Sequence, residues 1–173
     1  MNFADKLFNT AKSLTKVALQ SRRCTVTQVS EANRIIIMGN GPSLNDTIAT
    51  HGTLLRENQT MAVNFAANAS VFRDIKPRFY VLADPYFFSN ATDSNLRKLW
   101  SNLEAIDWRC TLYVPATVYR LTKERFASRP ITVESFNAVG SEGFRTIDHF
   151  LFKKGLAPQC TYPRYNARHQ SRI

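Results

Sequence analysis

The sequence predicts an α/β fold, with a mostly parallel sheet, flanking helices and an amphipathic helix at the N-terminus. Short apolar runs rich in β-branched residues alternate along the chain with segments of helical periodicity. The 173 residues, 44% of them hydrophobic, suit one domain with a sizeable core. Because alternating strands and helices are joined by right-handed crossovers, we expect a Rossmann-like sheet.

The first strand is predicted at Ile35–Met38. It consists of consecutive apolar residues, most of them β-branched. Such a run is typical of a parallel strand that is buried on both faces. We therefore expect this strand to lie in the interior of the sheet.

A glycine turn follows this strand. Gly39 and Gly41 flank Asn40, and glycine permits positive φ and lets backbone N–H groups approach a ligand. Pro42 suits the first turn of a helix, and Ser43 can cap the helix that begins near it. Unpaired N–H groups and the positive end of a helix dipole then meet at one point, which favours an anion. The turn is predicted to bind phosphate or a nucleotide, and an ordinary βα turn is the alternative.

Polar residues end the next two predicted strands. The strand at 60–65 places Asn64 near its end, before a helix at 66–75, and the strand at 78–83 leads into Asp84. Ligands of open α/β sheets bind at the carboxyl ends of the strands, so both side chains are candidate ligand-binding groups. Two other roles stay open, since Asn64 can cap the following helix and an aspartate before proline often forms a turn.

The rest of the chain continues the alternation. We expect helices at 93–106, 117–126 and 141–152, and strands at 110–114 and Ile131–Phe136. The aromatic residues at 86–88 can either fill the core or wall a pocket. The predicted nucleotide-binding domain spans 34–157. The basic stretch 158–173 has no periodicity and is expected to lack its own fold.

Positive charge is concentrated at the two ends of the chain. The net charge is +10, yet residues 1–23 and 151–173 each hold five Lys or Arg, and the first of these stretches holds one acid and the second none. The central part is close to neutral, which argues against nucleic acid as a partner. The helix at 2–20 is amphipathic and carries Lys6, Lys12 and Lys16. It is expected to pack on its own domain, or to lie on an anionic membrane surface or act as a presequence.

The three cysteines, Cys24, Cys110 and Cys160, are far apart and form no CxxC pair. Neither a disulfide framework nor a zinc site is indicated, which fits a cytoplasmic location, with peripheral contact at the inner membrane face as an addition. No apolar run reaches the length of a membrane span, and no secretory signal opens the chain. His149 and His169 have no catalytic companion at a diagnostic spacing, so no catalytic residue is assigned.

The motif IIIMGNGPSL, with Asn64 and Asp84-Pro85 after the next strands, resembles two related families of transferases. One is the bacterial lipooligosaccharide sialyltransferase family. The other is the MptE-like family, which includes hydroxymethylpterin diphosphokinases and a domain of motility accessory factors. The resemblance covers roughly residues 34–114, and the Gly-Asn-Gly-Pro-Ser turn is fairly specific when it follows a strand.

The sialyltransferase resemblance implies a glycosyltransferase of surface polysaccharide biosynthesis that takes a CMP-sugar donor and a glycan or small-molecule acceptor. It points to Asn40, Gly41, Ser43 and Asn64 as contacts to the nucleotide. Asp84 stands where sialyltransferases prefer asparagine, and it slightly favours the MptE-like alternative, an ATP-dependent diphosphokinase acting on a pterin alcohol with magnesium.

The segments that carry the catalytic groups of both families have no recognisable counterpart in this sequence. The chain is therefore expected to be a truncated or divergent member, and a non-catalytic binding or scaffold domain is a further alternative. A truncated parallel sheet would expose an unpaired edge, so self-association is also expected.

Overall fold

The computed structural model describes residues 3–20, 22, 24–25, 34–39, 43–89 and 92–138. The expected helix at 141–152, the stretch 158–173, and the turn residues Asn40 and Gly41 lie outside these ranges. The chain divides into two units, of which one comprises residues 30–135 and the other residues 1–29 with 136–173.

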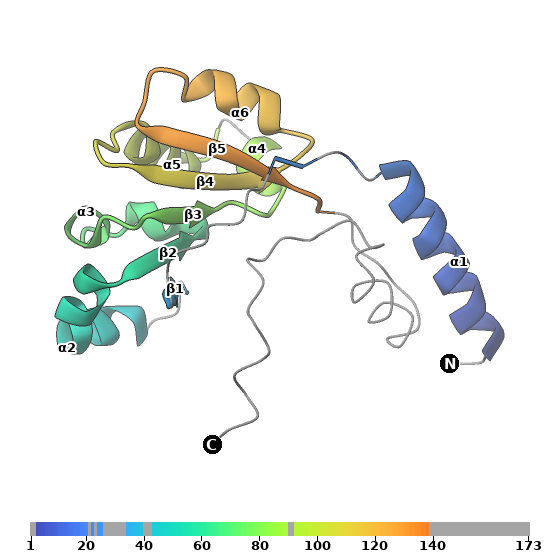
Figure 1. Ribbon diagram of the computed structural model, residues 1–173, viewed down its shortest axis with the longest axis horizontal. Coiled ribbons are helices and arrows are strands. Elements are labelled where there is room, and N and C mark those ends of the chain that lie inside the picture. Colours follow the sequence, from blue (N-terminus) through green and yellow to red (C-terminus); the bar gives the residue numbers. More distant parts are fainter. Residues whose placement is uncertain are drawn as a thin grey trace. The chain divides into compact units, whose positions relative to one another are not determined.

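The unit 30–135 is built on a sheet of five parallel strands with helices between them (Figure 1). This confirms the predicted α/β class. The strands are β1 (Ile35–Met38), β2 (Gln59–Val63), β3 (Phe79–Val81), β4 (Cys110–Pro115) and β5 (Ile131–Phe136). The connecting elements are α2 (Ser43–Glu57), η1 (Asn64–Asn68), α3 (Phe72–Ile75), α4 (Tyr86–Ser89), α5 (Ser94–Glu104) and α6 (Tyr119–Arg125), where η1 is a 3₁₀ helix.

The strands lie side by side in chain order, β1-β2-β3-β4-β5. Strand β1 therefore pairs with β2 alone among the described strands, and the expectation that it is an interior strand is wrong. Ile37 at its centre is 55% exposed. A run of apolar β-branched residues indicates a preference for a strand. It does not indicate how many other strands lie beside that strand in the sheet.

The helices cover one face of the sheet. Because every strand is placed one step further along in the same direction, right-handed crossovers carry all connecting helices to the same side. The core confirms this, since alternate strand residues such as Met38, Tyr80 and Leu112 share one buried cluster with Leu55 of α2 and Phe72 of α3. The same cluster contains side chains of α4, α5 and the end of α6, namely Phe87, Leu96, Leu99, Trp100, Leu103 and Phe126.

The other face of the sheet is also apolar. Met61, Phe79 and Tyr113 alternate with the core residues of β2, β3 and β4, and all three are buried. The rings of Phe79 and Tyr113 lie 6.3 Å apart. Burial raises the pKa of Tyr113 to about 12, with a further contribution from the charge of Glu134.

Helix α5 shows how the local sequence determines an element. Asp93 precedes it, and its carboxylate accepts a hydrogen bond from the Asn95 N–H at 2.8 Å, which satisfies one of the free donors of the first turn. The predicted start at Asp93 is confirmed. The predicted apolar face is confirmed as well, because Leu96, Leu99, Trp100 and Leu103 are all buried.

The segment 66–75, predicted as one helix, is divided in two. It contains most of η1, then a break at Ala69 with extended backbone, then the single turn α3. The amide side chain of Asn68 donates to the Asn95 carbonyl at 2.9 Å and accepts from Asn102 at 3.2 Å. These two bonds tie the end of η1 to helix α5.

The second unit contains helix α1 (Phe3–Gln20), as predicted. Arg22, which follows it, exchanges two hydrogen bonds with the side chain of Asn137: the Arg22 N–H donates at 2.9 Å and the Arg22 carbonyl accepts at 2.8 Å. Asn137 is buried, and these two hydrogen bonds satisfy both the oxygen and the nitrogen of its side-chain amide. Among the described helices, none has the length and apolar character that crossing a membrane requires.

Candidate functional site

The register of the sheet brings three predicted site residues to one edge. Met38, Ala62 and Tyr80 are aligned across β1, β2 and β3. Gly39 directly follows β1, Asn64 directly follows β2, and Asp84 comes shortly after β3. Because the three strands are parallel neighbours, these residues lie at the same carboxyl edge, where ligands of parallel sheets bind.

Gly39 is exposed, and a Cβ built on it would meet no atom within 4 Å among the described residues. Its φ does not lie in the left-handed region, so Gly39 does not use the positive φ that a glycine permits. The open space in front of Gly39 leaves its backbone accessible to a ligand, which is the other property for which a glycine is used.

Asn64 adopts a left-handed backbone with φ 53°, a conformation that few residues other than glycine accept and that asparagine tolerates best. The residue is exposed. The N-cap of η1 is Val63, not Asn64, and no side chain caps it, so the capping role that the sequence left open is not the one observed. The Asn64 side chain makes no hydrogen bond to another residue in the described ranges, which leaves its amide available.

Tyr80 holds this turn through its hydroxyl group. Its hydroxyl donates to the Asn64 carbonyl at 2.5 Å and accepts from the Ala67 N–H at 3.0 Å. The side chain is 0% exposed, and burial raises the pKa of its phenol above the usual range. Tyr80 therefore fixes both ends of the bend that presents Asn64. A buried tyrosine needs a hydrogen-bond partner for its hydroxyl. A tyrosine within a core strand is therefore the feature of the sequence that indicates such a supporting role.

Asp84 forms the turn that the sequence offered as one of its two roles. One carboxylate oxygen accepts from the Tyr86 N–H at 2.9 Å, and the Asp84 carbonyl accepts from the Phe87 N–H at 3.1 Å. The residue is exposed, and its second carboxylate oxygen receives no hydrogen bond within the described ranges. Asp84 thus shapes the start of α4 and keeps one oxygen for another partner.

Two aromatic residues stand beside this edge: Phe65, for which the sequence indicated no role, and Tyr86, from the aromatic stretch that was expected either to fill the core or to wall a pocket. Phe65 follows Asn64, and its ring lies 6.4 Å from that of Tyr86 in an edge-to-face arrangement. Tyr86 is 41% exposed, and its hydroxyl donates to the Asp93 carboxylate. This hydrogen bond raises the pKa of Tyr86 and lowers that of Asp93. The ring is therefore held in place while one part of it stays open to solvent.

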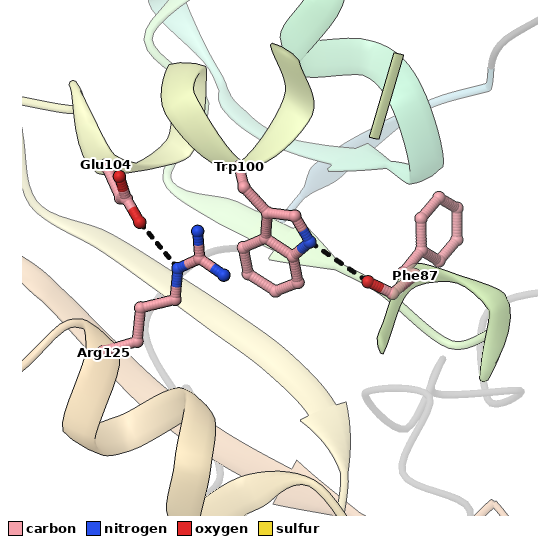
Figure 2. Close-up of polar contacts among 4 residues, drawn as sticks. All are labelled: Phe87, Trp100, Glu104 and Arg125. Atoms are coloured by element: carbon pink, nitrogen blue, oxygen red, sulfur yellow. Dashed lines mark hydrogen bonds and ion pairs between the residues drawn. The ribbon is translucent and has the colours of Figure 1, made fainter. Parts of the chain in front are cut away.

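A separate groove of about 550 Å³ lies among α4, α5 and α6. Figure 2 shows its central contacts: the Arg125 guanidinium stacks over the Trp100 ring at 4.4 Å, its Nε donates to Glu104 at 2.6 Å, and the Trp100 indole donates to the Phe87 carbonyl. None of the predicted site residues lines this groove. No group of three metal-ligating side chains is found in the part of the chain that the structure describes.

Three further predicted site residues follow β1. Asn40 and Gly41 lie outside the described ranges, as does the side chain of Ser43. The backbone of Ser43 begins α2, as predicted, so a helix N-terminus does follow β1 along the chain.

No family model matches the chain, and no curated protein or solved structure does either. The resemblance to the sialyltransferase and MptE-like families remains a prediction from the motif.

Proposed function

We propose that residues 34–138 form the nucleotide-binding part of a transferase, and that its donor is a nucleotide sugar such as a CMP-sugar. The observation that carries this proposal is the meeting of Gly39, Asn64 and Asp84 at one carboxyl edge, each after its own parallel strand. The N-terminus of α2 is the next described element after β1 and Gly39, and a helix N-terminus is a favourable place for a phosphate.

Each group at this edge has a chemical role in the proposal. The accessible backbone after β1 and the start of α2 hold phosphate through N–H groups. The free amide of Asn64 orients the ribose or phosphate, since it both donates and accepts. The exposed ring of Tyr86 offers a surface on which a base can stack. Stabilisation of the departing phosphate would then supply much of the catalysis. The acceptor in this proposal is a glycan of a surface polysaccharide or a small molecule.

Asp84 supports a second candidate, the ATP-dependent transfer of diphosphate to a pterin alcohol. That reaction needs a magnesium ion to offset the triphosphate charge, and magnesium is commonly held by one or two carboxylates together with the substrate phosphates. The free oxygen of Asp84 at the same edge fits such a role. Magnesium would have to strengthen ATP binding under this alternative, whereas a CMP-sugar site of the first kind binds without metal.

The test uses Asn64→Gly, because glycine keeps the left-handed backbone and removes only the side-chain amide. Isothermal titration of the full chain with CMP, and with ATP with and without magnesium, gives the affinities. Asn95→Ala is the matched control, since Asn95 is exposed at the start of α5 and contributes only backbone groups to its hydrogen bonds with the described residues.

We expect Asn64→Gly to weaken CMP binding about tenfold, the loss expected for one or two ligand hydrogen bonds, with no loss of stability. Asn95→Ala should bind like the unmodified chain. Equal effects of the two substitutions would remove the site assignment. Binding without turnover in the presence of acceptors would leave the non-catalytic binding domain as the function.

A further inference from the structure

We propose that α1 lies on the surface of an anionic lipid bilayer, with its apolar stripe in the interface. The stripe is defined by Leu7, Phe8, Leu14 and Leu19. This inference is independent of the proposed nucleotide site, because α1 belongs to the other unit of the chain.

The stripe is exposed along the whole helix. Leu7, Phe8, Leu14 and Leu19 are 57%, 70%, 44% and 80% exposed. Leu7 and Leu14 are two turns apart on one row, with Ala11 and Ala18 on the same row and both exposed. Phe8 and Leu19 form the adjoining row, three turns apart. Isolated exposed leucines are ordinary, but two neighbouring rows of them on one helix require a partner.

One margin of α1 is already covered, since Thr10 is only 7% exposed. The stripe is the part of the apolar surface that stays open.

The charge of the segment selects the partner. Residues 1–23 contain five Lys or Arg and only Asp5 as an acid, whereas the central part of the chain is nearly neutral. Lys12 is exposed and lies one turn after Phe8 and two turns before Leu19, at the margin of the stripe. An apolar stripe with a lysine at its margin is the pattern of a helix that lies in the plane of an anionic membrane surface, because the long side chain reaches from the margin to the lipid head groups. A nucleic acid would use the lysines but would leave the leucines and Phe8 exposed to water.

The test is co-sedimentation of the full chain with two kinds of vesicle. One is pure phosphatidylcholine, which is neutral, and the other contains about 30% phosphatidylglycerol, which makes the surface anionic. The test variant is Phe8→Gln with Leu19→Gln. The matched control is Leu54→Gln with Leu121→Gln, which removes two leucines that are exposed elsewhere, on α2 and α6. Lys12→Gln tests the charge, with Lys98→Gln on α5 as its control.

We expect the chain to partition onto anionic vesicles at least about tenfold more strongly than onto neutral ones, and the Phe8 and Leu19 variant to lose about tenfold or more of that binding. The Leu54 and Leu121 control should bind normally. Lys12→Gln should weaken binding about threefold to fivefold, and 0.5 M salt, roughly a 4 Å screening length, should weaken it further.

Three results would overturn the proposal. The first is the absence of vesicle binding by the unmodified chain. The second is a dimer, seen by sedimentation equilibrium, that the Phe8 and Leu19 variant abolishes, because a second copy would then cover the stripe. The third is binding to duplex DNA that is equal to vesicle binding and insensitive to the apolar substitutions. CMP affinity, measured alongside, should be the same for all these variants.

Discussion

At the scale of the residue, Tyr80 and Asn64 act together, because the buried tyrosine holds the turn that presents the asparagine. The asparagine holds a strained backbone at φ 53°, and such a conformation persists only where its surroundings determine it. The two hydrogen bonds of the buried Tyr80 hydroxyl hold the backbone of Asn64 in this conformation. A strained, exposed polar residue at the edge of a parallel sheet, supported by a buried side chain, is the arrangement expected of a binding group.

Tyr80→Phe tests this arrangement. The substitution leaves the buried Ala67 N–H without its acceptor, so we expect the free energy of unfolding to fall by about 1–3 kcal/mol. Nucleotide affinity should fall as well, because the Asn64 turn loses its support. Urea unfolding and calorimetric titration measure the two effects.

Tyr119→Phe is the control for this substitution, since the Tyr119 hydroxyl makes no hydrogen bond to a residue in the described ranges. It should change neither quantity by a measurable amount. If Tyr80→Phe lowers stability and leaves nucleotide affinity intact, Tyr80 supports the core alone and does not position Asn64.

Part of the site was predictable at this scale and part was not. Asn64 and Asp84 could be predicted because the sequence indicates where the strands end and because both residues are polar. Tyr80 was not assigned because its neighbours in the strand are apolar, and a tyrosine among them reads as core packing. Its role depends on which carbonyl lies above its hydroxyl, and the sequence does not show that distance.

Helix α5 anchors the helical layer at the scale of the element. Leu99 is 0% exposed at its centre and belongs to the core cluster between the helices and the sheet. Truncation of such a side chain removes its burial and leaves a cavity, since the packed neighbours relax only in part.

We expect Leu99→Ala to lower the free energy of unfolding by about 2–5 kcal/mol. Leu121→Ala on α6 is the matched control, because Leu121 is 66% exposed, and it should change stability by less than about 0.5 kcal/mol. Chemical unfolding followed by circular dichroism measures both. Similar losses for the two leucines would mean that the core is not centred on α5.

The elements themselves were largely predictable, whereas their arrangement was not. The cap and apolar face of α5 are local properties, and both were found. The position of β1 at the edge of the described sheet is a property of strand order, which periodicity does not carry. The division of segment 66–75 comes directly after Asn68, whose side chain bonds to Asn95 and Asn102, and contacts between residues so distant in the chain are not visible in local periodicity.

At the scale of the whole molecule, the order of the strands determines which strand ends are neighbours at the candidate site. In a doubly wound sheet the ligand crevice forms where the strand order reverses. The five described strands follow one another without a reversal, so the candidate site depends on neighbouring strand ends and on the turns after them. The unpaired edge of β1 within this set keeps self-association as a prediction.

The buried thiol of Cys110 makes stability depend on pH. Burial raises its pKa from 9.0 to about 12. The unfolded chain releases this proton near pH 9 while the folded chain keeps it, so unfolding releases a proton and stability falls as the pH rises from 9 towards 12. This contribution costs about 1.4 kcal/mol per pH unit in that window. We expect Cys110→Ala to be less stable at pH 7 but to lose less stability between pH 9 and 10.

Urea unfolding of both proteins at pH 7, 9 and 10 measures this difference. Stability curves that run parallel across the three pH values would show that Cys110 ionises as readily in the folded chain as in the unfolded one.

The central claim is that a nucleotide binds where β1, β2 and β3 end. The most direct measurement is a map of backbone amide shifts in the ¹H–¹⁵N spectrum of the full chain as CMP is added. The account predicts that the largest shifts fall on Gly39, Asn64 and Phe65 and on the residues around Asp84, with Arg97 and Leu121 in the separate groove unchanged. Shifts confined to that groove, or no shifts with CMP or with ATP and magnesium, would contradict it.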